Sequence, residues 1–310
     1  MNTATKTKLY TSFKSAIKPI RMWGISSIWP FSIIYRFIIS HIVPDMEKVI
    51  EVNGYYLKIR IGGGRDAAGI GAMLLSDDVH DPVQTSMFKD FIKPGMTVVD
   101  VGANIGYYTM LAAGLTGDTG KVYSIEPEQG NMDTLMENVM LNGYQNVTLI
   151  LGAAGNRNGI TDLYVSGISS GSHSVAVDRA DGGHKVKVPI FTLDNILQQG
   201  TPVHLVKSDT EGNDMDVMRG ARRVIRENRN IVWTMEVWPS GLSKINESVD
   251  SLFALVRANG FTRAVMMDER SGVFVTVDIS NPDTVRNYTK WHNSCNVIFT
   301  KGRDWNAPAG

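Results

Sequence analysis

VVDVGANIGYYT, residues 98–109, decides the fold of this chain. The segment runs from a hydrophobic strand that ends in Asp100, through a turn with Gly102 and Gly106, into a helix. Glycines suit such a turn because the backbone bends sharply and approaches a ligand with no Cβ in the way. The N-terminus of the following helix presents unpaired N–H groups to a negatively charged group. The segment therefore predicts a ligand site at the carboxyl end of a strand.

The spacing of the glycines discriminates between ligands. A dinucleotide site carries the pattern G-x-G-x-x-G. Asn104 and Tyr107 occupy its second and third glycine positions here, which counts against an NAD(P)-dependent oxidoreductase. The remaining pattern, D-x-G-x-N-x-G, starts with an acid and suits a ligand with an ammonium and a carboxylate, such as the methionine end of S-adenosylmethionine. Glu126 ends the next strand, where a carboxylate can accept hydrogen bonds from both ribose hydroxyls.

Regular alternation of strands and helices from residue 93 to 302 predicts an α/β domain with a parallel sheet. Strands are expected at 96–101, 121–127, 146–154, 203–209, 231–238, 261–267 and 294–301. Helices are expected at 105–115, 131–143, 214–225 and 249–258. Residues 156–190 interrupt this rhythm with two strands around the Gly/Ser-rich stretch GISSGSHS. We expect them to form a hairpin insertion or a lid.

Two segments precede this domain. Residues 46–92 form a small strand-rich lead-in with a hairpin expected around Asn53-Gly54. Within the N-terminal segment 1–45, residues 1–44 carry six basic side chains and no acid, with aromatic and apolar residues between them. This segment fits peripheral contact with a membrane surface, or packing on the protein or across a homo-oligomer, which we slightly favour. Its apolar stretch 28–43 is too interrupted for a membrane span.

The composition excludes several classes of function. Lys+Arg and Asp+Glu both count 31, so no overall field attracts nucleic acid. Cys295 is the single cysteine of the 310 residues, which excludes an intrachain disulfide and a thiolate metal cluster. We expect a cytoplasmic protein, with or without peripheral membrane contact, that acts on a small molecule or a glycan.

Three ordered blocks, DVGANIGYYT, IEPEQGNMDTLMENVMLNG and VKSDTEGNDMDVMRGA, resemble the FkbM family of class I S-adenosylmethionine-dependent methyltransferases. The resemblance implies a Rossmann-like, mostly parallel sheet of seven strands with an antiparallel last strand. It also implies methylation of oxygen on sugars, glycolipids or polyketides. The cofactor ligands that it implies are Gly102, Asn104, Gly106 and Glu126, to which the pattern above adds Asp100. It places Lys207, Asp209, Glu211 and Gly212 beside the transferred methyl group.

Acidic residues at strand ends supply the chemistry expected on the acceptor side. A sugar hydroxyl is a poor nucleophile near neutral pH, so a positioned base helps as its proton leaves. We expect Asp209 to be this base and Glu211 to hold acceptor hydroxyls, although Glu211 equally fits the turn before a helix. Together with Asp214 and Glu236 these acids could instead hold Mg²⁺, but we expect no metal.

The function expected from the sequence is O-methylation of a hydroxyl on a carbohydrate, glycolipid or secondary metabolite. N- or C-methylation on the same fold and a catalytically silent binding module stay open as alternatives.

Overall fold

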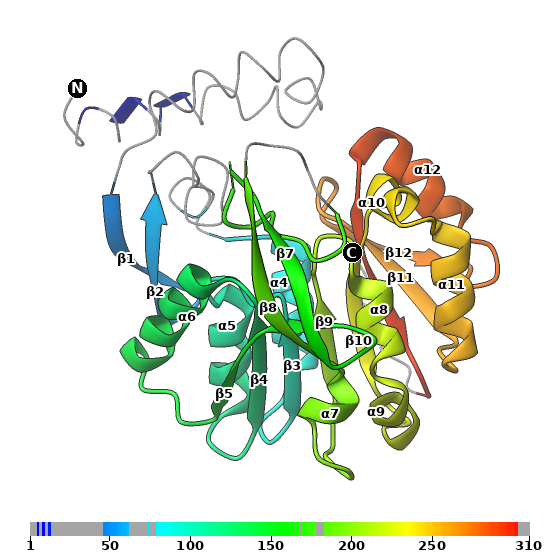
Figure 1. Ribbon diagram of the computed structural model, residues 1–310, viewed down its shortest axis with the longest axis horizontal. Coiled ribbons are helices and arrows are strands. Elements are labelled where there is room, and N and C mark those ends of the chain that lie inside the picture. The colour runs from blue at the N-terminus through cyan, green and yellow to red at the C-terminus, as the bar shows by residue number, and fades with distance from the viewer. Residues whose placement is uncertain are drawn as a thin grey trace.

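A central sheet with helices on both faces dominates the computed structural model (Figure 1). The structure describes residues 5, 8–9, 12–13, 46–61, 74, 79–167, 169–177 and 183–302. The expectations for residues 1–45 lie almost wholly outside the described residues. Within the described ranges, no helix has the length and apolar character needed to cross a membrane.

The central sheet has eight strands in the order β12-β11-β13-β10-β9-β3-β4-β5. Five neighbouring strands run parallel: β3 (Thr97–Val101), β4 (Lys121–Glu126), β5 (Val147–Leu151), β9 (Leu205–Ser208) and β10 (Val232–Val237). The last strand, β13 (Cys295–Thr300), is antiparallel to both of its neighbours, β10 and β11 (Arg263–Asp268). The α/β fold with a reversed last strand is confirmed. The sheet has one strand more than expected, because the chain turns back after β11 and adds β12 (Val273–Val277) at the edge.

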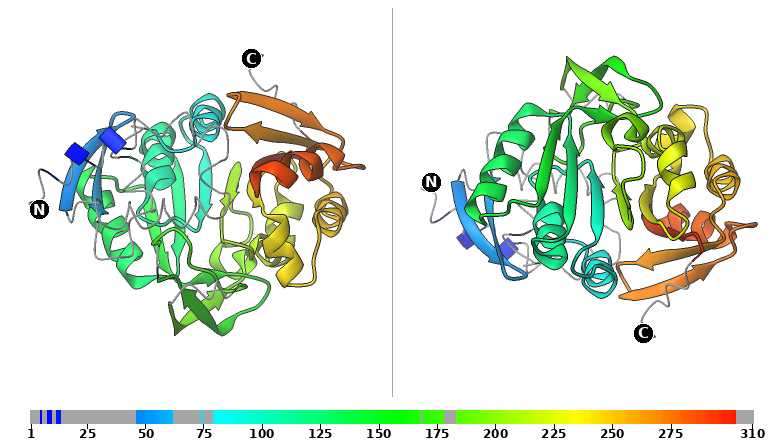
Figure 2. Two further views of the ribbon diagram at one scale, coloured as in Figure 1. Left: turned by 90° about the horizontal axis from the view of Figure 1, so that it is seen from above. Right: turned by 90° about the horizontal axis from the view of Figure 1, so that it is seen from below.

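Two hydrophobic cores lie on opposite faces of the sheet, because successive side chains of a strand point to opposite sides. Val98 belongs to one core and Val99 to the other. The first core is covered by α4 (Pro82–Phe91), α5 (Tyr107–Thr116) and α6 (Gln129–Leu141). The second is covered by α7 (Leu193–Ile196), α8 (Asp214–Arg219), α9 (Arg222–Glu227), α10 (Pro239–Lys244), α11 (Val249–Ala258) and α12 (Asp283–His292). Figure 2 shows the two layers from both ends.

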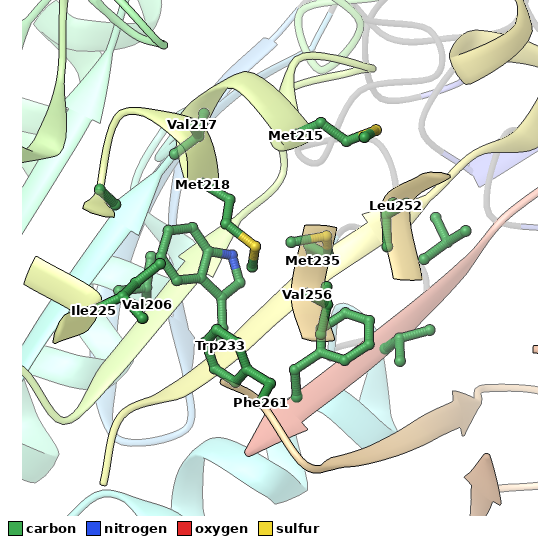
Figure 3. Packing of buried hydrophobic residues seen from close by; sticks show 14 of the residues in the cluster. Val206, Met215, Val217, Met218, Ile225, Trp233, Met235, Leu252, Val256 and Phe261 are labelled. Atoms are coloured by element: carbon green, nitrogen blue, oxygen red, sulfur yellow. The ribbon is translucent and has the colours of Figure 1, made fainter. Parts of the chain in front are cut away.

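Trp233 lies at the centre of the second core (Figure 3). Its indole packs among Met218, Ile225 and other apolar side chains and is fully buried. The polar indole nitrogen is satisfied, since it donates a hydrogen bond to Ser208 Oγ at 3.1 Å. This hydrogen bond connects the start of β10 with the end of β9.

The helix expected at 214–225 is two short helices, α8 and α9. They are separated at Gly220, where a Cβ would lie only 1.9 Å from the carbonyl oxygen of Gly155. The chain therefore bends there to pack against the strand region after β5. The lead-in is also less strand-rich than expected, because residues 82–91 form helix α4.

The hairpin expected around Asn53-Gly54 is present as β1 (Met46–Val52) and β2 (Tyr55–Ile61). Its buried side chains belong to the same core as α5 and α6. Asn138 of α6 and Asn142, the C-cap residue of this helix, complete its outer edge. Asn142 exchanges hydrogen bonds with the backbone N–H and carbonyl of Tyr56, at 2.7 and 2.6 Å. Asn138 does the same with Lys58, at 2.6 and 3.4 Å.

The insertion expected at 156–190 forms a separate three-stranded sheet in the order β6-β8-β7. Its strands are β6 (Ala153–Ala154), β7 (Gly159–Val165) and β8 (His184–Phe191). The described part of the β7–β8 connection reaches the carboxyl end of the central sheet, where Ser169 and His173 line a cavity.

Candidate active site

A cavity of about 380 Å³ opens at the carboxyl ends of β3, β4, β9 and β10. Ligand sites of open α/β sheets occur at this edge, and the volume lies within the usual range for small-molecule pockets. Six of the residues expected from the sequence line it: Gly102, Asn104, Glu126, Lys207, Asp209 and Glu211. Asp100, Gly106 and Gly212 do not.

The two glycines of the turn are required mainly by the packing of the protein itself. Gly102 has φ +74°, and a Cβ there would lie 2.0 Å from the carbonyl oxygen of Asp209. Gly106, with φ +95°, caps α5, and a Cβ there would lie 2.4 Å from Leu135 Cδ1 on α6. Gly106 was expected to be a cofactor ligand, but the structure places it against α6.

Asp100 lies beneath the cavity and not in its lining. It is fully buried, accepts a hydrogen bond from Thr109 Oγ1 at 2.7 Å, and has Oδ1 3.2 Å from Lys207 Nζ. Lys207 Nζ is also 3.7 Å from Asp209 Oδ2. Burial lowers the pKa of Lys207, but the charges of Asp100 and Asp209 outweigh it and raise the pKa above its ordinary value. Asp100 therefore holds a buried ammonium, and that ammonium faces Asp209.

Glu126, at the end of β4, is held by three donors. The backbone N–H groups of Asn104 and Glu128 donate to its two oxygens, each at 2.9 Å, and Asn131 Nδ2 lies 3.4 Å from Oε1. Burial raises its pKa to about 7, although these donors oppose the rise. A carboxylate oxygen accepts more than one hydrogen bond, so both oxygens retain capacity for ribose hydroxyls.

Three acids gather at the other end of the cavity. Asp209 and Glu211 follow β9, and Glu236 is the residue before the last of β10. Met235 pairs with Ser208 in the sheet, so the next residues, Glu236 and Asp209, lie side by side. Burial raises the pKa of Glu236 well above its ordinary value, and the charges of Glu211 and Asp209 add to the rise.

The β7–β8 connection links the two ends of the cavity. The carbonyl oxygen of Ser170 accepts hydrogen bonds from Asn104 Nδ2 at 2.9 Å and Asn131 Nδ2 at 3.0 Å. Ser174 Oγ donates to the carbonyl oxygen of Glu211 at 2.8 Å. The insertion therefore forms part of the cavity wall and contacts both the Glu126 region and the turn after β9.

A further part of the cavity wall comes from distant segments and was not expected from the sequence. His80 and Tyr108 line the cavity, and His80 Nε2 lies 3.3 Å from Asp81 Oδ2. Glu269, in the turn between β11 and β12, accepts hydrogen bonds from the first N–H groups of α4, those of Val83 and Gln84, each at 2.9 Å. Burial raises the pKa of Glu269 to about 7. These residues meet only through the tertiary fold.

Carboxylates such as those around the cavity are typical ligands of magnesium. Across the described ranges of the chain, no group of three or more His, Cys, Asp or Glu side chains has an arrangement suited to a metal ion.

Comparison with known proteins identifies a family match. Residues 100–262, more than half of the chain, match the model of the methyltransferase FkbM domain. A protein-L-isoaspartate O-methyltransferase of Methanococcoides burtonii is 34% identical over 74 residues, which are 23% of this chain and 36% of that protein. The chain thus matches about a third of the length of this curated relative.

Solved structures of methyltransferases are also similar to part of this structure. A putative rRNA-methylase from Clostridium thermocellum has 13% identity and a TM-score of 0.43, over 70% of this chain and 93% of that one. M. jannaschii TYW2 in complex with AdoMet has 15% identity and a TM-score of 0.40, over 83% of this chain and 85% of that one.

Proposed function

The chain belongs to the FkbM methyltransferase family, and on this premise we propose that it transfers a methyl group from S-adenosylmethionine to a hydroxyl of an uncharged, carbohydrate-like acceptor. The family and the cofactor expected from the sequence are confirmed. The observation that carries the proposal is a single cavity that joins the Gly102 turn and Glu126 at one end to the acids Asp209, Glu211 and Glu236 at the other.

The residues at the first end fit the cofactor. Glu126 would hold the ribose hydroxyls, and the backbone of Gly102 and Asn104 would hold the methionine end. The bound cofactor supplies an electrophilic methyl group on a positively charged sulfur. The Ser170 carbonyl, fixed by Asn104 and Asn131, holds the β7–β8 connection against this end and excludes water. Alignment and exclusion of water are the main tasks of an enzyme in such an in-line displacement.

The residues at the second end fit a hydroxylated acceptor. Carboxylates accept hydrogen bonds from hydroxyl groups, and among the described lining residues the acids there outnumber the one Lys or Arg side chain, that of Lys207. An acceptor with a phosphate or carboxylate would be repelled. Asp209 was expected to be the base, but its carboxylate faces Lys207 Nζ, so we propose that it orients the acceptor hydroxyl. Glu211 would bind neighbouring hydroxyls of the acceptor.

Thermal unfolding with added ligands tests the cofactor assignment. A ligand that binds only the native state raises the melting temperature. S-adenosylhomocysteine should raise it, and NAD should not. Release of S-adenosylhomocysteine from the cofactor in the presence of neutral methyl glycosides, but not of their phosphorylated counterparts, tests the acceptor class. Stabilisation by NAD alone would refute the proposed function.

A further inference from the structure

Glu236 is an acid of the cavity for which no catalytic role was expected from the sequence. It is carried by β10, on a different strand from Asp209 and Glu211. Its Oε2 is buried and has no hydrogen-bond partner in the part of the chain that the structure describes. Buried polar atoms in native proteins nearly always have a partner. An unpartnered carboxyl oxygen in the wall of a cavity therefore points to a group that enters the cavity with a ligand.

The surroundings of Glu236 favour its neutral form when the cavity holds no cation. Burial disfavours its charge, and nearby negative groups add to this effect. The titratable groups that face it are Asp209, Glu211 and Asp214 after β9, and the thiol of Cys295 at the start of β13. Lys207 is the cation of this neighbourhood, and it is engaged by Asp100 and Asp209.

The cofactor would change this balance, because it carries a positive charge that its demethylated product lacks. An opposite charge within about 4–6 Å favours the ionised form of a carboxyl by about 1–3 pKa units. We propose that Glu236 is a further catalytic residue, which is protonated in the free enzyme, releases its proton when the sulfonium enters the cavity, and takes the acceptor's proton during methyl transfer. This inference rests on the proposed function.

The step balances in atoms and charge. The acceptor oxygen forms a bond to the methyl carbon, the bond from that carbon to sulfur breaks, and its electron pair stays on sulfur. The O–H proton of the acceptor moves to the carboxylate of Glu236. The sulfur is now neutral, so the carboxyl is again neutral in its acidic surroundings. Asp209 keeps its place beside Lys207 throughout, which leaves it to orient the hydroxyl.

Calorimetry of the two cofactor forms tests the inference without knowledge of the acceptor. S-adenosylmethionine and S-adenosylhomocysteine share the ribose and the methionine end, so the contribution of Glu126 is common to both. Titrations at pH 7 in buffers with different ionisation enthalpies count the protons released. We expect up to one more proton to be released with S-adenosylmethionine. The affinity for S-adenosylmethionine, relative to that for S-adenosylhomocysteine, should then rise with pH, by at most tenfold per pH unit.

Variants assign the proton to its residue. Glu236→Gln should remove the difference in proton release and make the affinity ratio independent of pH, while S-adenosylhomocysteine binds as before. Glu269→Gln is the matched control, because Glu269 is another cavity acid of raised pKa, but its carboxylate accepts hydrogen bonds from two backbone N–H groups. The Glu269→Gln variant should show the same difference in proton release between the two ligands as the parent protein.

Two results would overturn the inference. One is equal proton release with both ligands in the parent protein, a measurement that needs no variant to fold. The other is an unchanged difference in a folded Glu236→Gln protein. Failure of the parent protein to bind S-adenosylhomocysteine at all would instead count against the proposed function.

Discussion

At the scale of single residues, Gly102 has to satisfy two conditions at once. Its φ of +74° is one that side chains with a Cβ rarely adopt, and the Asp209 carbonyl leaves no room for a Cβ. Glu126, the proposed ribose ligand, is likewise tied to the protein, since the backbone N–H groups of Asn104 and Glu128 donate hydrogen bonds to it. Substitutions at these positions therefore affect the architecture of the site as well as binding.

Gly102→Ala should lower the melting temperature and weaken S-adenosylhomocysteine binding together. The added methyl group would lie 2.0 Å from the Asp209 carbonyl oxygen, so the ends of β3 and β9 must separate. Differential scanning fluorimetry and calorimetry measure the two effects. Gly143→Ala is the control, since Gly143 has φ +68° and no neighbour within 4 Å of a built Cβ. Unchanged stability in Gly102→Ala, with binding lost, would show that the clash is with the ligand alone.

Glu126→Gln should weaken S-adenosylhomocysteine binding more at pH 8 than at pH 6. The pKa of Glu126 is about 7, so the carboxyl is mostly ionised at the higher pH and mostly neutral, like the amide, at the lower. Hydrogen bonds to a charged group contribute about 1.5–3 kcal/mol, which predicts a loss of roughly 10- to 150-fold at pH 8. Calorimetry at both pH values measures it. The neighbouring Glu128→Gln should show no such dependence; an equal loss for Glu126→Gln at both pH values contradicts the ribose assignment.

At the scale of secondary-structure elements, the pairing of β3 with β9 joins residues that are 107 positions apart. Asp100 and Lys207 are Cα partners in these parallel strands, and their side chains form a buried ion pair. The sequence does not predict this ion pair, because Asp100 belongs to a pattern that we interpreted as a cofactor-binding motif. A buried pair of this kind stabilises mainly because each charge would be costly without the other.

Lys207→Met should destabilise the protein by about 3–5 kcal/mol, the usual cost of leaving one charge of a buried pair without its partner. Urea unfolding measures the loss. In the double variant with Asp100→Asn, part of the stability should return, because the buried carboxylate is also removed. Additive losses in the double-mutant cycle would mean that the two side chains do not depend on each other.

The contrast between local patterns and contacts of distant segments explains which parts of the fold and the site were predictable. Gly102, Asn104 and Glu126 belong to one strand–turn–helix–strand unit, whose local spacing the sequence preserves. Glu236 was expected at a strand end with Asp209 and Glu211, and β10 brings it beside them. Glu269 reaches the cavity through the order of β10, β13 and β11 in the sheet, which no local pattern encodes. β12 was missed because its residues VFVTV follow a charged turn and form an edge strand. The break at Gly220 depends on the approach of Gly155, a contact across 65 residues.

At the scale of the whole molecule, acids of raised pKa gather around one cavity. Burial raises the pKa of Glu126 and Glu269 to about 7 and that of Asp214 to about 6. Burial also raises the pKa of Glu236, and its acidic neighbours raise it further. The ligand-free protein therefore concentrates an unfavourable charge in the region that is to receive a cation, and its stability should depend on pH in a characteristic direction.

The melting temperature of the ligand-free protein should fall by several degrees between pH 5 and pH 7.5. An acid whose pKa is higher in the folded state binds its proton more tightly there, so stability is lost as pH rises from the unfolded to the folded value. For Glu126 this interval runs from 4.5 to about 7, a loss on the order of 3 kcal/mol. Scanning fluorimetry across this range measures it. Glu269→Gln should make the melting temperature depend less on pH. Glu227→Gln should not, because the pKa of Glu227 is lowered in the folded protein. A melting temperature that rises over the whole interval contradicts the charge assignment.

Asn138 of α6 and its C-cap residue Asn142 have a consequence for the solubility of the chain. The outward backbone groups of a hairpin offer a template on which another molecule can add a strand, a common route to aggregation. Along β2 these groups are already bonded to the two amide side chains, one helical turn apart, at Tyr56 and Lys58. A helix thus takes the place of a neighbouring strand and closes this side of the hairpin to intermolecular β-pairing.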